Sequence, residues 1–292
     1  MSKRILFRGF ESTKRAPGLG DIFDYCQICY LKGKEFGFDD IHIVFPRWGP
    51  FNHEGWGISE EDFNWQPTKF LPWKWYPRNK AINIEEWDKV VNTLESNSLY
   101  EGYNGINTGF YHTSQYLSMY YKEKKLFPYI DVKRDSKEDY ILFQYRTNFS
   151  DMAYHSETRT TLLSDFQFVF NTIKEFLGDK YSYYQIGNTC SISDQFDKVI
   201  PNMYGDLDNL AKLICNSSLM VASHSGIANI SFIMPGLPII IQSLVAEVWY
   251  NGKLAVDGHP NWCDGKVLIF KKGKPINKKL ILDFLKKHNL YD

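Results

Sequence analysis

The fold class is indicated most directly by residues 219–242, LMVASHSGIANISFIMPGLPIIIQ. An apolar run ends at His224, a helical pattern follows over 225–234, and the segment 235–242 combines a tight Pro-Gly turn with a second apolar run. Short apolar runs bounded by turn residues are typical of buried strands. Because strand, helix and strand follow one another directly, this stretch predicts an α/β fold with a parallel sheet.

The same alternation extends through the rest of the second half. The patterns predict strands at 140–146 and 181–187, helices within 156–178 and 205–218, and a last helix near 276–289. Strands that alternate with helices build parallel sheets covered by those helices. The second half is therefore expected to be one α/β domain.

The first half begins in the same way. A strand at 4–10, a helix at 21–36 and a strand at 41–46 have the length of a β-α-β unit. Residues 47–78 are rich in Trp, Pro and Gly and are predicted to form a loop. Two more helical patterns complete this half, at 84–96 and 111–125.

A polar stretch at 132–139, VKRDSKED, is the predicted linker. With 292 residues, the chain is long enough for two domains of roughly 150 residues each. We therefore expect an N-terminal domain at 1–135 and a C-terminal domain at 136–292.

The composition is that of a folded protein without excess charge. Hydrophobic residues make up 43%, and 34 basic residues balance 34 acidic ones. Disorder requires few apolar residues, and phosphate-backbone binding favours a basic protein, so we expect neither disorder nor a nucleic-acid partner. The sequence lacks the apolar run of about 18 residues of a membrane span, and its N-terminus is too polar for a secretory signal.

The five cysteines are too few and too scattered for a disulfide framework, which fits a reducing, cytoplasmic compartment. Cys26 and Cys29 form a CxxC inside a helical pattern, and no second pair follows at zinc spacing. Core cysteines are therefore favoured over redox or metal chemistry.

The first candidate site lies in APGLGD, residues 16–21, between the first strand and the first helix. Gly18 and Gly20 let the backbone approach a phosphate or an acceptor, and the N–H groups of a helix start can bind an anion. Asp21 is either the N-cap of the helix or a general base. A nicotinamide site is not favoured, because GxGxxG is absent.

The second candidate site follows the apolar run that ends at His224. Ser225 and Gly226 open a helix, whose N–H groups and serine hydroxyl can bind an anion such as a diphosphate. The alternative is an ordinary αβ unit with a serine cap. His224 either contacts a ligand or packs in the core.

The third candidate is Arg146, at the carboxyl end of the strand 140–146, where ligands of open α/β sheets bind. A guanidinium group suits bidentate binding of phosphate oxygens, with a surface salt bridge as the alternative. Arg159, in the loop that follows, is a further candidate for binding the same ligand.

These motifs resemble the ADP-heptose:lipopolysaccharide heptosyltransferase family, which carries Gly-Asp after its first strand and [ST]-G-x-x-H before a small-residue helix and a Pro-led strand. The segment FQYRTN, residues 143–148, is also similar to the H-x-R region of GDP-fucose-using fucosyltransferases. Both belong to the GT-B group, in which two Rossmann-like domains face each other across an active-site cleft. The resemblance covers most of the chain in the order of its elements.

The resemblance implies roles for individual residues. Asp21 would be the base, Arg146 would contact the diphosphate, and residues 225–226 would form the donor phosphate loop. His224 and Asn229 stand where the family has an acidic residue and a histidine, and they are expected to contact the donor.

Asp206-Leu207-Asp208 has the letters of a DxD metal motif. Its place at the start of a helical pattern favours helix capping over metal binding. We therefore expect neither a metal ion nor a cofactor, with a nucleotide sugar as substrate.

Five of the eight tryptophans fall between Trp48 and Trp75. Aromatic faces stack on sugar rings and long loops often carry function, so Trp48 and Trp56 are candidate contacts to a glycan acceptor. A loop packed by its own aromatic residues and contact with a membrane surface are the alternatives.

The C-terminal segment 271–289, KKGKPINKKLILDFLKKHN, is rich in lysine. It contains an apolar stripe at helical spacing, formed by Ile276, Leu280, Ile281, Phe284 and Leu285. The stripe is expected to dock on the body and to leave the lysines in solvent. A weak attraction to anionic lipids or acidic glycans is the alternative.

The favoured function is a metal-independent, inverting glycosyltransferase. It would move a hexosyl, fucosyl or heptosyl group from a nucleoside diphosphate donor in the second domain to a glycan or glycolipid acceptor in the first. Fold alone does not fix function. The alternatives are a pyruvyltransferase- or epimerase-like enzyme on the same fold, or a catalytically silent protein that binds glycans or nucleotides.

Overall fold

The computed structural model of the chain describes residues 4–8, 19–45, 70–77, 99–100, 130–133, 138–145, 161–187, 189–200, 207–223, 225–244, 266–271 and 273–291. The chain forms two compact units. One comprises residues 1–132 and 204–211, and the other comprises 133–203 and 212–292. The acceptor and donor roles of 1–135 and 136–292 stay predictions.

The first unit contains a parallel sheet and a long helix. Its strands lie in the order β3-β2-β1-β4, and neighbouring strands are parallel. The elements are β1 (Arg4–Arg8), α1 (Leu19–Glu35), β2 (Asp40–Phe45), β3 (Lys74–Pro77) and β4 (Leu99–Tyr100). The β-α-β unit predicted for the start of the chain is thereby confirmed, with α1 as its crossover helix.

The prediction that residues 47–78 form a loop is wrong at its end, because β3 occupies one edge of the sheet. Trp75 and Tyr76 favour a strand, and Pro77 is tolerated because an edge strand leaves one side of its backbone unpaired. The helices predicted at 84–96 and 111–125 lie outside the described residues.

Helix α1 buries an aromatic and thiol-bearing face. The Trp73 side chain is 2% exposed, and its ring centroid lies 6.1 Å from those of both Phe23 and Tyr30. Cys26 and Cys29 are buried, and burial raises the pKa of the Cys26 thiol, with Cys29 as the second cause. Buried protonated thiols are unreactive, so the interpretation of this pair as core cysteines is confirmed.

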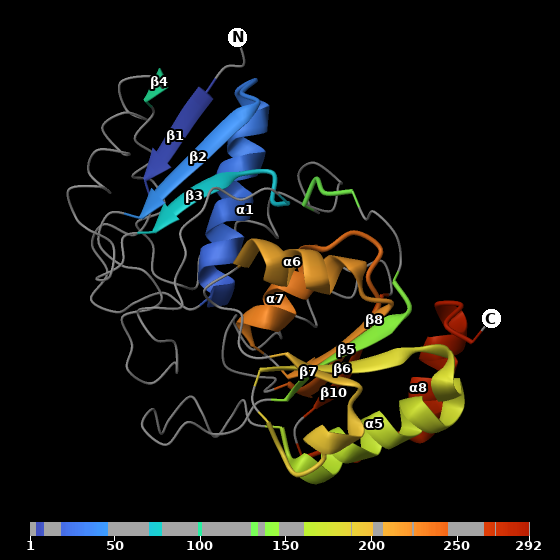
Figure 1. Cartoon of the computed structure of the whole chain (residues 1–292). Coiled ribbons are helices and arrows are strands. Elements are labelled where there is room, and N and C mark those ends of the chain that lie inside the picture. The colour runs from blue at the N-terminus through green and yellow to red at the C-terminus, as the bar shows by residue number, and fades with distance from the viewer. Residues whose placement is uncertain are drawn as a thin grey trace. The chain divides into compact units, whose positions relative to one another are not determined.

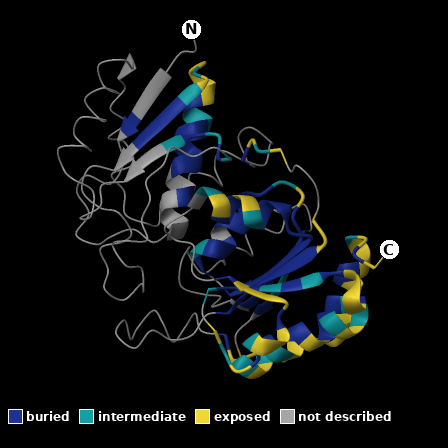
Figure 2. Ribbon diagram, in the orientation of Figure 1, coloured by how far each residue is buried: buried dark blue, intermediate teal, exposed yellow. Residues whose placement is uncertain are grey.

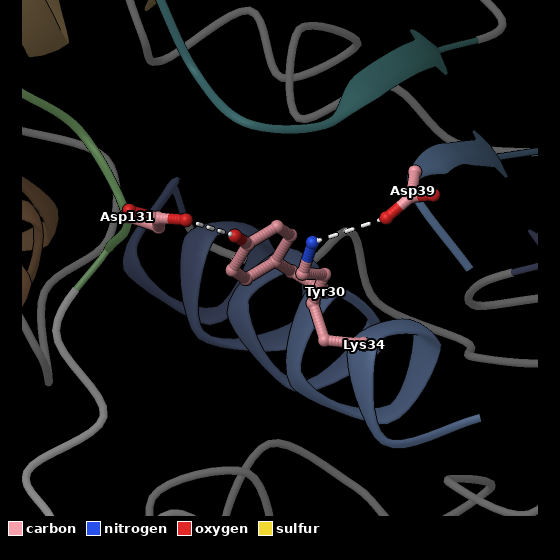
Figure 3. A network of polar contacts seen from close by, with 4 residues as sticks. All are labelled: Tyr30, Lys34, Asp39 and Asp131. Carbon is pink, nitrogen blue, oxygen red and sulfur yellow. Dashed lines mark hydrogen bonds and ion pairs between the residues drawn. The ribbon is translucent and has the colours of Figure 1, made fainter. Parts of the chain in front are cut away.

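Polar contacts hold α1 to the segments around it (Figure 3). The Tyr30 hydroxyl donates to Asp131 Oδ2 at 2.9 Å, and Lys34 Nζ lies 3.5 Å from Asp39 Oδ1. Burial, followed by this hydrogen bond, raises the pKa of Tyr30. The lysine contact is exposed and adds little stability, so the tyrosine contact is the stronger of the two.

The second unit contains a six-stranded parallel sheet in the order β10-β9-β8-β5-β6-β7. Its strands are β5 (Tyr140–Tyr145), β6 (Ser182–Gly187), β7 (Lys198–Ile200), β8 (Leu219–Ser223), β9 (Ile239–Leu244) and β10 (Val267–Lys271). Its helices are α5 (Leu163–Leu177), α6 (Leu207–Asn216, which the first unit shares), α7 (Gly226–Ile233) and α8 (Lys278–Lys287). Short 3₁₀ turns lie at Gly178–Lys180 and Ser193–Gln195. The strands and helices predicted for this half are confirmed, and β7 was too short to stand out in the sequence.

Helices cover both faces of this sheet, with α7 on one face and α5 with α8 on the other (Figure 1). Alternate residues of a strand point to opposite faces. On β5, Ile141 and Phe143 join the core beneath α5 and α8, whereas the Tyr140 hydroxyl donates to the backbone oxygen of Leu213 on α6 at 2.6 Å. The described side chains of β5 and β8 are all buried, as Figure 2 shows in dark blue, which explains their continuous apolar runs.

Helix α8 docks on the body as predicted, with one exception. Ile281, Phe284 and Leu285 are buried, but Leu280 is 47% exposed. The inclusion of Leu280 in the buried stripe was wrong, because one residue turns an α-helix by about 100° and carries it out of the interface. Crossing a bilayer takes a longer and more apolar helix than any in the described part of the chain.

Candidate functional site

The strand order of the second unit creates a switch point between β5 and β8. The chain leaves β5 for β6 on one side, and later returns to pair β8 on the other side. Such a sheet has the 3-2-1-4-5-6 order of open α/β folds, whose ligands bind at the carboxyl ends of the strands beside the switch. This carboxyl edge is the candidate site.

A buried hydrogen bond links the end of β5 to the start of α7. Ser225 is the N-cap of α7, where its Oγ accepts from the backbone N–H of Ala228 at 3.4 Å. The same hydroxyl donates to Oε1 of Gln144 at 2.8 Å. Gln144 is 4% exposed and Ser225 is 7% exposed. Because little water reaches either group, this bond fixes the orientation of the hydroxyl.

Two further polar contacts lie at the same edge, toward α5. Oγ1 of Thr161 and Oγ of Ser223 are 2.6 Å apart. Gln242, which pairs with Ser223 across β8 and β9, donates from Nε2 to the backbone oxygen of Asp165 at 3.4 Å. Gln242 Oε1 is buried without a hydrogen-bond partner within the described residues. A buried acceptor of this kind calls for a water molecule or a ligand.

Burial also changes the acidity of groups at this edge. It raises the pKa of the Asp165 carboxyl group in the first turn of α5. It raises the pKa of the Tyr145 hydroxyl at the end of β5, with Cys190 as the second cause. Loss of solvent is the main cause of both shifts.

A glycine with a positive φ stands at the carboxyl end of β6, where it pairs with Tyr145 at the end of β5. Gly187 ends β6 with φ of 87°, in the left-handed region that glycine adopts without strain. A Cβ atom there would lie 4.0 Å from the backbone oxygen of Tyr145. The glycine therefore serves the backbone conformation more than the packing.

The start of α7 can bind an anion. The first N–H groups of a helix have no acceptor within the helix, and among the described residues the Ser225 hydroxyl accepts from that of Ala228. The N–H groups of Gly226 and Ile227 precede it in the first turn. A phosphate oxygen can accept hydrogen bonds from such groups, and Gly226 has no side chain to obstruct it.

Ser225 and Gly226 thus lie together at the carboxyl edge. Ser225 caps α7, as the alternative interpretation of this motif predicted, and Asn229 lies within the same helix. Their contact with a donor stays a prediction. Six other predicted site residues lie outside the described residues. They are the donor contacts Arg146, Arg159 and His224, the loop glycine Gly18, and the acceptor contacts Trp48 and Trp56.

Gly20 and Asp21 lie in the first turn of α1, which begins at Leu19. The prediction that Asp21 opens the helix is wrong by two residues, a common error because helix ends are weakly marked in a sequence. A carboxylate in a first turn is favoured by the helix dipole. This position does not test whether Asp21 acts as a base, so that role stays a prediction.

Asp208 is held by backbone groups. Its carboxylate accepts hydrogen bonds from the N–H groups of Phe70 and Leu71, each at 2.9 Å. Asp206, the other acid of the DxD letters, lies outside the described residues. In the part of the chain that the structure describes, no three His, Cys, Asp or Glu residues gather as a metal site requires.

Sequence reasoning missed four polar residues of this edge: Gln144, Thr161, Ser223 and Gln242. Three of them share a signal, because each is a polar residue near the carboxyl end of an otherwise apolar strand. Burying a polar group is unfavourable unless it is hydrogen-bonded. A polar residue at the same place in several parallel strands is therefore a mark of a site.

No protein-family model matches the sequence, and no curated protein matches it. Among solved structures, the chain is similar to the E. coli ADP-heptose lps heptosyltransferase II, at 10% identity and a TM-score of 0.51, over 99% of this chain and 98% of that chain. It is also similar to a glycosyl transferase family 9 protein from Veillonella parvula, at 12% identity and a TM-score of 0.45, over 99% and 98% of the two chains. The E. coli heptosyltransferase WaaC with ADP-2-deoxy-2-fluoro heptose matches at 9% identity and a TM-score of 0.44, over 97% and 99%.

The likeness to heptosyltransferase II concerns the arrangement of the backbone. It confirms the predicted fold class, the α/β fold of GT-B glycosyltransferases. The cleft between two facing domains and the fucosyltransferase-like role of Arg146 stay predictions.

Proposed function

We propose that the protein is a glycosyltransferase that transfers a sugar from a nucleoside diphosphate donor to a glycan or glycolipid acceptor. The observation that carries the proposal is the capped start of α7 at the switch point, held by the bond from Ser225 to Gln144. A helix start at this place suits a diphosphate. The name of the E. coli protein with the same fold, an ADP-heptose transferase, supports this class of donor.

In the proposed reaction, Asp21 accepts the proton of an acceptor hydroxyl. The hydroxyl oxygen attacks the anomeric carbon of the donor and forms the new glycosidic bond. The bond from that carbon to the diphosphate oxygen breaks, and its electron pair leaves with the diphosphate. Arg146 and the N–H groups of α7 offset the negative charge that develops there. In-line attack inverts the anomeric configuration, and the scheme requires no metal ion or cofactor.

The two halves of the chain take different substrates in this proposal. Residues 1–135, with Trp48 and Trp56, bind the acceptor. Residues 136–292 bind the donor, and the groups proposed there besides Arg146 and the start of α7 are Arg159, His224 and Asn229. The contact of either half with its substrate is part of the proposal.

Ligand binding tests the donor first. The purified protein is titrated calorimetrically with ADP, GDP and UDP, with adenosine, guanosine and uridine as controls that lack the diphosphate. At least one diphosphate is expected to bind more tightly than its nucleoside. At about 100 times its Kd, it should stabilise the native state by about 2.7 kcal/mol in a thermal-shift experiment. No binding of any of the three would contradict the proposed donor class.

Turnover then separates an enzyme from a silent binding protein. The protein is incubated with sugar esters of the nucleoside diphosphate that binds, together with candidate glycan acceptors. The expected result is release of the nucleoside diphosphate and a product heavier by one glycosyl residue in mass spectrometry. Tight binding without release under any condition would favour the silent binding protein.

A further inference from the structure

We propose that Gln144 is a positioning residue of the diphosphate site. It holds the proton of the Ser225 hydroxyl away from the ligand, so that backbone N–H groups of α7, and not this hydroxyl, bind the diphosphate. The inference rests on the proposed function. It concerns which groups of the site hold the ligand, and it reverses the direct role that the sequence suggested for the serine side chain.

The first step is the hydrogen-bonding capacity of one hydroxyl group. A serine hydroxyl carries a single proton and two acceptor lone pairs. In Ser225, one lone pair accepts the backbone N–H of Ala228, and the proton is donated to Gln144 Oε1. A hydroxyl that has given its only proton to Gln144 has none to give to a phosphate oxygen.

The second step is what this arrangement leaves at the helix start. With the N–H group of Ala228 capped, Gly226 and Ile227 contribute the backbone donors that precede it in α7. The direction in which these N–H groups point depends on the first turn of α7 being held in place. The bond to Gln144 ties that turn to β5, across the switch point of the sheet.

The third step is the position of Gln144 on its strand. Its neighbours Phe143 and Tyr145 point to the core under α5 and α8, so Gln144 points to the face that α7 covers. It is 4% exposed. A buried amide lowers stability unless it is bonded, and the Ser225 hydroxyl supplies a partner for its oxygen.

The experiment compares Gln144→Met, Ser225→Ala and the double variant with the wild type. Inorganic pyrophosphate and ADP are the probes, adenosine is the control ligand, and affinities are measured well below the melting temperature of each variant. Each single variant should bind pyrophosphate and ADP about 3- to 10-fold more weakly, the range of one hydrogen bond. The double variant should be no weaker than the weaker single variant, because both changes break one interaction. Adenosine affinity should not change.

Two further variants control for folding. Ser225→Thr keeps a hydroxyl group and should restore pyrophosphate affinity to within about 2-fold of the wild type. Gln185→Met makes the same substitution at a buried glutamine of β6. It should lower the melting temperature without weakening pyrophosphate binding.

Two results would overturn the inference. If Ser225→Ala weakens binding but Gln144→Met leaves it unchanged or tightens it, the hydroxyl freed from Gln144 binds the ligand directly. If both variants change only the melting temperature, the bond is merely structural. Failure of the proposed function looks different, because the wild-type protein itself would then bind no nucleoside diphosphate.

Discussion

The polar contacts at the amino ends of the strands differ from those at the carboxyl ends. At the amino ends of β2 and β3, Asp40 Oδ1 lies 2.9 Å from both His42 Nε2 and Lys74 Nζ. At the amino end of β6, the Tyr183 hydroxyl donates to the backbone oxygen of Gly178 at 2.7 Å. These contacts join neighbouring elements of the fold to one another.

The carboxyl-end contacts surround the start of α7, which we propose as the diphosphate site. The Gln144–Ser225 bond fixes the first turn of α7, and helix starts carry N–H groups that the helix itself does not satisfy. The comparison separates two uses of polar residues at the ends of the strands. Amino-end residues should act on stability, and carboxyl-end residues should act on binding and turnover.

The largest effect on turnover is expected for Asp21→Asn, in the first turn of α1, the helix that follows β1. Asparagine preserves the shape of the side chain but cannot accept the proton of an acceptor hydroxyl. Turnover should fall by about 100-fold or more, the usual contribution of acid–base catalysis. The measurement is kcat with a working donor and acceptor.

The control for Asp21 is Asp24→Asn on the same helix, which should leave kcat unchanged. The melting temperature of the Asp21 variant should fall only slightly, because a carboxylate in the first turn of a helix gains about 0.3–1 kcal/mol from the helix dipole. Wild-type turnover in the Asp21 variant would show that this carboxylate only stabilises α1.

The next effect is expected for Arg146→Ala, directly after β5. Loss of a guanidinium contact to the diphosphate should weaken binding by about 1.5–3 kcal/mol, the scale of a hydrogen bond to a charged group. Calorimetry with ADP, GDP and UDP measures it. Lys180→Ala removes an exposed cation elsewhere in the same unit and should not change affinity. Equal affinities for the Arg146 variant and the wild type would place the arginine outside the site.

The sequence predicts the strands and helices at both edges of the sheet better than it predicts the side-chain contacts among them. β5 and β8 are apolar throughout or nearly so, because both faces are covered, and such runs are visible without a structure. The cap at Ser225 was also predictable, since serine directly before a helical pattern is a local signal.

The partners of these residues are harder to predict. Gln144 is 81 positions from Ser225 in the chain, and Thr161 is 62 positions from Ser223. Only the pairing of β5 with β8 brings such segments together, and sheet order is not a local property. Trp73 is a similar case. Its stretch suggested sugar contacts, yet this ring packs in the core beside α1.

A smaller effect, on stability alone, is expected for Tyr183→Phe at the amino end of β6. Burial is the main cause that raises the pKa of Tyr183, to about 12 from the ordinary 10.0. The native state therefore favours the protonated hydroxyl. Its contribution to stability is fully present below pH 10 and is lost as the pH rises through 12. Phenylalanine should lower the unfolding free energy at neutral pH by about 1 kcal/mol and make its alkaline decline less steep.

Urea denaturation at several pH values between 7 and about 12 measures both effects of Tyr183→Phe. Tyr184→Phe, one residue further along β6, is the matched control, because its ring stacks on Tyr140 and does not depend on the hydroxyl. A change in nucleoside diphosphate affinity for the Tyr183 variant would break the division between amino-end and carboxyl-end residues.

The smallest effect is expected from metal removal. The Asp208 carboxylate already accepts hydrogen bonds from Phe70 and Leu71, and its place in the first turn of α6 favours a structural role. Turnover should therefore survive dialysis against EDTA. Asp208→Ala should leave kcat unchanged but lower the unfolding free energy by about 1–3 kcal/mol, because two backbone N–H groups lose their acceptor. If EDTA abolishes turnover, manganese restores it, and Asp208→Ala prevents that rescue, the DxD letters mark a metal site and the diphosphate is neutralised by a cation instead of by α7.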